Sequence, residues 1–153
     1  MAEGRLLGIA RHDRPRGPME VVDRVRVTCG LGVQGDFRGA TRPGKTPRRQ
    51  VTLMEAESWQ AALADIGAHA PWQERRANLL TGGIRLPRRA GAVLRIGPDL
   101  RIEITGECDP CSRMEKVAPG LKAALLPDWR GGVIGRVIED GAIAVGDEVR
   151  IEE

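Results

Sequence analysis

Two cysteines separated by two residues, Cys108 and Cys111, carry the clearest chemical signal in this chain, because a thiolate can coordinate a soft metal or attack an electrophile. They stand in the run Cys-Asp-Pro-Cys-Ser-Arg-Met-Glu at residues 108–115. The preceding residues 100–105 alternate apolar and polar side chains, which predicts a half-buried strand that Gly106 ends. The cysteines are therefore expected directly after a strand.

A helix is predicted to begin directly after the second cysteine. Ser112 has Glu115 three residues later, the spacing of a capping box. Cys111 would then precede the helix, where the positive end of the helix dipole and the nearby Arg113 favour thiolate over thiol. We therefore predict that Cys111 is the more reactive of the two sulfurs.

Three other interpretations of the cysteine pair stay open at this point. It could be half of a zinc site, a dithiol redox couple or two buried small side chains. A zinc site needs about four ligands, and the chain adds only Cys29, His12 and His69, none at finger-like spacing. A thioredoxin-like couple normally follows a βαβ pattern, which the neighbouring sequence does not show.

Length and composition predict one domain over residues 1–153, in a reducing compartment. The three cysteines are an odd number, and no apolar stretch reaches transmembrane length. The chain begins Met-Ala-Glu-Gly-Arg, without the hydrophobic region of a signal peptide. We therefore expect a cytoplasmic protein that does not associate with a membrane.

Charge and aromatic content argue against nucleic acid as a partner. The net charge is only +3, and the chain has one phenylalanine, three tryptophans and no tyrosine. A single-strand binder would need more aromatic surface for stacking, and a duplex binder would need a broader basic face. A small basic nucleic-acid binder is therefore the least supported reading.

Short strands dominate the predicted secondary structure, because 20 glycines and 10 prolines are spread along the whole chain. The predicted strands are 6–10, 20–27, 50–54, 76–80, 92–96, 100–105, 132–138 and 148–152. One helix is predicted over 55–66, and a second from Ser112 that Pro119-Gly120 should break into two pieces. The predicted fold is mainly β, a barrel of short strands with a few packed helices.

Two further segments carry groups that can bind an anion. Residues 37–54 hold five cations and no carboxylate, and Arg48 and Arg49 lead into the predicted strand at 50–54. Arg76 and Asn78 are two apart on a predicted strand and should share a face. A solvated basic loop and ordinary cross-strand pairing explain these features as well.

Taken in order along the chain, these motifs resemble a stand-alone MOSC domain, named after the C-terminal domain of molybdenum cofactor sulfurases. The resemblance covers nearly the whole chain. The motifs that carry it are Gly17-Pro18-Met19, residues 30–36 (GLGVQGD), 49–53 (RQVTL), Arg76-Ala77-Asn78, 109–114 (DPCSRM) and 146–149 (GDEV).

The resemblance implies a β-rich barrel that binds the molybdenum cofactor, molybdopterin. Cys111 matches the family's thiolate ligand to molybdenum and is the implied catalytic residue, with Ser112 beside it in the cofactor site. Arg76 and Asn78 match the contact to the pterin and its phosphate. Arg48 and Arg49 are expected to contact the phosphate.

Some family members reduce N-hydroxylated compounds with electrons from a separate reductase, and we expect this oxidoreductase activity here. The alternative is a non-catalytic carrier of sulfur or of the cofactor. Cys108 would then distinguish the two, because it could pack, protect Cys111 as a disulfide or accept a persulfide. His12 and His69 are candidate proton donors by residue type only.

Overall fold

The computed structural model describes residues 3–152, which form eleven strands, three α-helices and two 3₁₀ helices. The strands are β1 (Glu3–Arg11), β2 (Glu20–Val22), β3 (Arg24–Thr28), β4 (Gly32–Val33), β5 (Val51–Glu55), β6 (Leu79–Gly82), β7 (Val93–Ile96), β8 (Leu100–Glu107), β9 (Val133–Glu139), β10 (Gly141–Ala144) and β11 (Glu148–Glu152). The helices are α1 (Ala56–Asp65), α2 (Arg113–Val117), α3 (Leu121–Ala124), η1 (Trp72–Arg75) and η2 (Pro127–Trp129).

Seven of the strands close into a barrel, in the order β11-β7-β8-β9-β5-β6-β1, with β1 pairing back onto β11. β2 extends the sheet by pairing with β1 outside the closed ring. Closure removes the exposed strand edges that an open sheet would present. The predicted fold class, a mainly β barrel with a few packed helices, is confirmed.

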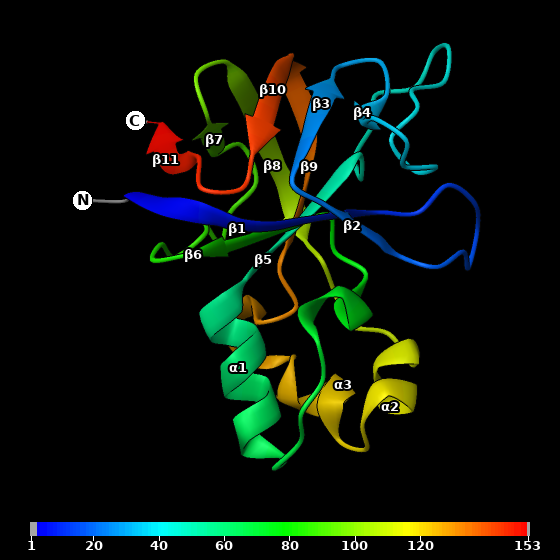
Figure 1. The fold of residues 1–153 in the computed structure, drawn as a ribbon, viewed down its shortest axis with the longest axis vertical. Helices are drawn as coiled ribbons and strands as arrows, with labels where there is room; N and C mark the ends of the chain where they lie inside the picture. Colours follow the sequence, from blue (N-terminus) through cyan, green and yellow to red (C-terminus); the bar gives the residue numbers. More distant parts are fainter. Residues whose placement is uncertain (1–2, 153) are drawn as a thin grey trace.

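One pair of barrel strands, β5 and β6, is parallel, while the other barrel pairings are antiparallel. Parallel neighbours need a crossover connection, and α1 supplies it. Figure 1 shows α1, α2 and α3 gathered at one end of the barrel, below β5 and β6. This arrangement places the start of α2 near the ends of several strands.

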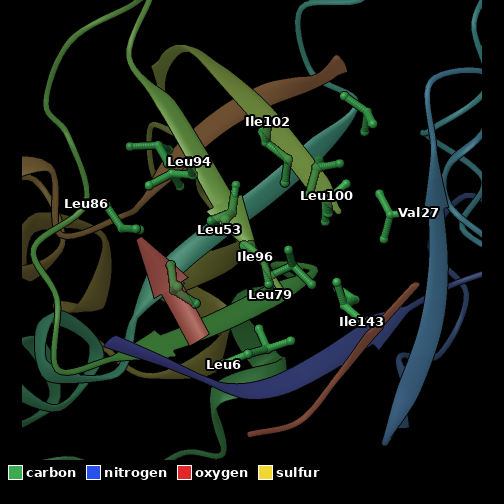
Figure 2. Close-up of a cluster of buried hydrophobic side chains, with 14 of the residues drawn as sticks. Leu6, Val27, Leu53, Leu79, Leu86, Leu94, Ile96, Leu100, Ile102 and Ile143 are labelled. Atoms are coloured by element: carbon green, nitrogen blue, oxygen red, sulfur yellow. The ribbon is translucent and has the colours of Figure 1, made fainter. Parts of the chain in front are cut away.

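Two hydrophobic clusters hold the structure together, one inside the barrel and one beneath the helices. Figure 2 shows the barrel cluster, in which Leu53 and Leu79 point inward among buried side chains such as Leu6, Leu94 and Ile102. The next residue of each strand, Met54 or Leu80, faces the helices instead. Every residue of β5 and β6 is therefore buried, and their sequences, VTLME and LLTG, do not show the strict alternation of a half-exposed strand.

Most predicted elements are confirmed within one or two residues. The helix predicted at 55–66 is α1, and the helix predicted from Ser112 is indeed broken, because Ala118 is extended and Gly120 has a φ of 88°. β4, β10 and both 3₁₀ helices were not predicted, since elements of two to four residues carry too little periodicity to detect.

Two predicted strands are wrong in part. The strand predicted at 20–27 is two strands separated at Asp23, since β2 pairs with β1 while β3 joins a second, three-stranded sheet with β10 and β4. The strand predicted at 76–80 begins at Leu79, because Arg76 ends the 3₁₀ helix η1. None of the helices in residues 3–152 is long and apolar enough to cross a membrane.

Candidate functional site

A cavity of about 250 Å³ opens where β1 and η1 end and β5 and α2 begin. Segments from five parts of the chain line it. Its walls are His12, Pro15, Arg16, Asp36, Arg38, Arg49, Gln50, Thr52, Arg75, Arg76, Asn78, Cys111, Arg113 and Met114. Four of the six predicted site residues line it, namely Arg49, Arg76, Asn78 and Cys111.

Cys111 is an exposed free thiol in the cavity wall, and its carbonyl accepts the hydrogen bond of the Met114 N–H at 2.9 Å. The predicted capping box beside it is wrong. Ser112 has helical dihedral angles and makes no side-chain cap, so its hydroxyl has no partner among residues 3–152, and the residue is exposed. The Glu115 carboxylate instead accepts from the N–H groups of Gly120 and Lys122, at 3.1 and 2.9 Å, and so fixes the turn into α3.

Cys108 differs from Cys111 in its exposure and in its contacts. It is buried, with 4% of its surface exposed, and Nη2 of Arg75 lies 3.4 Å from its sulfur. The same guanidinium donates to the carbonyls of Cys108 and Gly131, both at 2.9 Å. Arg75 is itself buried and has no carboxylate partner among residues 3–152, so it brings an unneutralised positive charge to the cavity wall.

Arg76 reaches the cavity through an unusual backbone conformation. Its φ of 66° is left-handed, which costs a non-glycine residue roughly 1–2 kcal/mol, and such strain collects at functional sites. Nη2 of Arg76 donates to the Gly17 carbonyl at 2.8 Å. Burial, and then the charge of Arg113, lower the pKa of the Arg76 guanidinium, which indicates that cations crowd one another here.

Asn78 lies in the same wall, but most of its hydrogen-bonding capacity is used internally. Its Oδ1 accepts from the backbone N–H and the hydroxyl of Thr52, and its Nδ2 donates to the Ala10 carbonyl at 3.1 Å. Only one N–H of the amide is left without a partner among the described residues. Asn78 therefore ties β1 to β5, and its contact to the pterin stays a prediction.

Arg48 and Arg49, which were both predicted to contact the phosphate, lie in different surroundings just before β5. Arg49 lines the cavity, whereas the Arg48 side chain lies outside it, next to Gly106 on β8. Gln50 holds this entry in place, because its Nε2 donates to the carbonyls of Cys29 and Gly39 and its Oε1 accepts from the Val137 N–H at 2.8 Å. The sequence placed Gln50 in a predicted strand and in the RQVTL motif but gave its side chain no role.

His12 and Asp36 form a buried pair. The sequence indicated His12 as a candidate proton donor but did not connect it with Asp36. Nδ1 of His12 lies 3.3 Å from Oδ1 of Asp36, but it is not aligned for a hydrogen bond and has no partner among the described residues. Asp36 accepts instead from the His12 backbone N–H at 3.0 Å. Burial lowers the pKa of His12; the charge of Asp36 opposes this, and Arg76, Arg38 and Arg113 add to it.

The two histidines have different surroundings, which separates the two candidate proton donors. His12 is in the cavity wall, with its ring packed edge-on against Phe37. His69 lies in a different hollow beside α1. Of the two, only His12 is therefore placed to serve the cavity.

The cavity is strongly positive, since six arginines and a single carboxylate line it. Arg16, Arg38, Arg49 and Arg113 make no ion pair and no side-chain hydrogen bond with residues 3–152. We call these four the unpaired cavity arginines. Sequence reasoning found Arg38 and Arg49 through the basic loop but gave Arg16 no role and treated Arg113 only as a neighbour of Cys111. Arg16, from the β1–β2 turn, and Arg113, from the start of α2, line the same cavity only because the fold brings these distant segments together.

A second, more open hollow lies on the outer side of Cys111. It has a volume of about 530 Å³ and is lined by Arg16, Cys111, Ser112, Arg113 and Lys116. Cys111 therefore stands between an inner cavity and an outer hollow, and the two share Arg16 and Arg113.

Comparison with protein families gives a match to the MOSC domain over residues 40–150. The chain belongs to the MOSC domain family. MOSC domains are associated with the molybdenum cofactor, which agrees with the resemblance seen in the sequence. A search of curated proteins gives no match.

Solved structures with this MOSC fold share little sequence with the chain. The YuaD protein from Bacillus subtilis has 18% identity and a TM-score of 0.79, covering 97% of this chain and 95% of YuaD. YiiM from Escherichia coli has 18% identity and a TM-score of 0.67, covering 97% and 70% of the two chains. YiiM from Geobacillus stearothermophilus has 15% identity and a TM-score of 0.66, covering 98% and 73%.

The residues of this MOSC domain fit a phosphate-bearing cofactor with a soft metal. Cys111 offers an accessible thiol, and the surrounding guanidiniums suit a phosphate group. His12 adds a buried nitrogen that lacks a partner. The zinc alternative has no such support, because no three His, Cys, Asp or Glu side chains gather as a possible metal site in residues 3–152.

Proposed function

We propose that this MOSC protein binds the molybdenum cofactor and reduces N-hydroxylated compounds with electrons from a partner reductase. The observation that carries the proposal is the position of Cys111, an accessible thiol in a cavity with six arginines and one carboxylate. When bound, the cofactor supplies a metal that accepts two electrons and passes them to an N–O bond. The overall change is R–NHOH + 2 e⁻ + 2 H⁺ → R–NH₂ + H₂O.

Each group of the cavity has a role in this proposal. Cys111 is the metal ligand, while Arg49 and Arg76 hold the cofactor phosphate together with the buried cation of Arg75. Asn78 can offer its one free N–H to the pterin. Arg48 is a weaker candidate for the phosphate contact, because its side chain lies outside the cavity.

His12 is the proposed carrier of one of the two protons. Its lowered pKa makes the protonated ring a minor species at neutral pH and a stronger acid than an ordinary histidine. His12→Gln should lower turnover while molybdenum content stays unchanged. A variant that turns over at the wild-type rate would remove His12 from this role.

The cofactor assignment is tested by metal and pterin analysis of protein from a host that makes the cofactor. Cys111→Ser should lose molybdenum and activity with reduced methyl viologen as artificial donor. Cys29→Ser is the matched control, since Cys29 is also an exposed free thiol but lies outside the cavity. Equal molybdenum in wild type and Cys111→Ser, or none in either, contradicts the proposal.

The carrier alternative would use a persulfide on Cys108 or Cys111. Burial of Cys108 argues against its use as an accessible sulfur acceptor. Incubation with a cysteine desulfurase followed by mass spectrometry distinguishes the two functions. Persulfide on either cysteine, without reductase activity, would favour the carrier.

A further inference from the structure

The outer hollow beside Cys111 contains more positive charge than the protein neutralises. Arg16, Arg113 and Lys116 line it, and none of them makes an ion pair or a side-chain hydrogen bond with residues 3–152. Elsewhere on the surface, arginines such as Arg101 and Arg136 pair with carboxylates on neighbouring strands. Cations left together without a counterion repel one another, and an anion between them relieves that repulsion.

The nearby carboxylates do not neutralise these cations. Glu115 precedes Lys116 in the chain, but its two oxygens accept from backbone N–H groups at the start of α3. Glu74 lines an adjoining hollow with Arg113 and Lys116, yet it makes no ion pair with either. The free Ser112 hydroxyl adds a hydrogen-bond donor to the same wall.

Backbone strain supports a role for this wall in binding. Arg16 has a φ of 60°, in the left-handed region that non-glycine residues rarely adopt. Strained residues persist where the surrounding structure needs their side chain in one place, which is common at ligand sites. Here the strained turn after β1 places Arg16 in the wall of the hollow that Cys111 also lines.

We propose that the outer hollow binds a phosphate monoester carried by the substrate, held by Arg16, Arg113, Lys116 and the Ser112 hydroxyl. Three cations match the double negative charge of such a group, and the arginine forks suit its oxygens. The adjoining hollow, where Pro18, Met19 and Val117 lie beside the polar side chains of Gln73, Glu74 and Arg76, can take the rest of the same molecule. The inference rests on the proposed reductase function and names its substrate class.

The first test needs no cofactor. Inorganic phosphate is added to the ¹⁵N-labelled protein at constant ionic strength, and backbone amide shifts are followed by NMR. Residues 112–117 should shift with saturation in the wild type, and Lys116→Ala, at a lysine that lines the outer hollow but not the inner cavity, should weaken the phosphate affinity about tenfold. Lys122→Ala is the matched control, because Lys122 is an exposed lysine outside the hollow. Unsaturable shifts, or equal loss in the control, mean an adventitious ion only and overturn the proposal.

The second test compares N⁴-hydroxycytidine, its 5′-monophosphate and its 5′-carboxylate as substrates of the molybdenum-loaded protein, with reduced methyl viologen as donor. The monophosphate should have a kcat/KM about tenfold above the nucleoside, mainly through a lower KM. That ratio should fall toward one in Lys116→Ala and stay in Lys122→Ala. Equal kcat/KM for nucleoside and monophosphate, or an equal gain with the carboxylate, overturns the phosphate assignment.

Two further outcomes keep this inference separate from the reductase proposal. If no compound is reduced by loaded protein while phosphate still saturates the hollow, the reductase function fails and the hollow remains an anion site of unknown use, which overturns its assignment to a substrate. If Lys116→Ala loses molybdenum or pterin, the hollow holds the cofactor phosphate instead, and the substrate assignment is wrong.

Discussion

The charged side chains at the two ends of strand β5 differ in whether the protein supplies them with partners. At the C-terminal end, the buried Glu55 carboxylate accepts from the Ser58 hydroxyl at 2.8 Å, the Leu86 N–H at 2.6 Å and Arg88 at 2.5 Å. Burial alone would raise the pKa of Glu55, but these donors, Arg88 first, hold it below its ordinary value. This charge is fully compensated inside the protein.

At the other end, Arg49 opens into a cavity where six arginines face one carboxylate. No internal acceptor satisfies the unpaired cavity arginines, and two of the guanidiniums around them are buried or partly buried. Removal of one partner of a compensated buried charge destabilises the fold, whereas an uncompensated cluster favours binding of an anion from outside. The comparison therefore assigns one end of β5 to stability and the other to function.

The largest expected effect is the loss of the compensated charge. Glu55→Ala leaves Arg88 and the Leu86 N–H without their acceptor, so we expect the free energy of unfolding to fall by about 3–5 kcal/mol. Arg49→Ala, at the other end, should change it by less than about 0.5 kcal/mol. Urea unfolding of both variants checks this. Similar losses in the two variants would contradict the division between the ends of β5.

The next largest effect is stabilisation of the protein by an anion that binds the unpaired cavity arginines at the Arg49 end of β5. Phosphate at 100 times its dissociation constant should stabilise the wild type by about 2.7 kcal/mol, because it binds the folded state only. Chloride at equal ionic strength should do less, and the double variant Arg38→Ala with Arg49→Ala should lose part of the gain. Thermal unfolding measures it, and identical curves in phosphate and chloride would refute an anion site.

The pH dependence of stability should report the buried His12. Because its folded pKa lies below the ordinary value of 6.5, the unfolded chain binds more protons in the window between the two pKa values. Stability therefore rises with pH through that window and falls as pH drops below 6.5, by up to about 1.4 kcal/mol per pH unit. Urea unfolding of wild type and His12→Gln between pH 5 and pH 8 should differ by this contribution. Parallel profiles for the two proteins would show that His12 does not titrate abnormally.

The smallest expected effect is a gain in stability at the functional end. Arg16→Gly relieves the left-handed backbone strain and should raise the free energy of unfolding by about 0.5–1 kcal/mol. The same variant should bind phosphate more weakly, because the strained conformation positions the Arg16 side chain that contacts the ligand. A destabilised Arg16→Gly would mean that the side chain has a structural role that the described contacts do not show.

Much of the secondary structure could be predicted because its signals are local. The alternation at 100–105, the strand predicted at 50–54 and the break at Pro119-Gly120 all appear within two residues of the expected places in the structure. The capping box failed because Glu115 was available to a second helix start, a competition that residue spacing alone does not reveal.

The site was predicted only in part, since its members come from segments that meet through long-range contacts. Gln50 reaches Val137 across 87 residues, and Asn78 reaches Ala10 across 68. These hydrogen bonds bring the basic loop, η1 and the end of β1 together. The convergence of His12, Arg16 and Arg113 at Cys111 has no sequence signal of its own.

The sequence by itself determined a β-rich chain, a cysteine placed between a strand and a helix, and membership of a family through ordered motifs, because such features depend on local chemistry and spacing. Only the tertiary structure decided which cysteine is accessible, which cations go unpaired and which histidine faces the cavity. Burial and charge compensation depend on which residues are neighbours in space, and the closed barrel determines those neighbours.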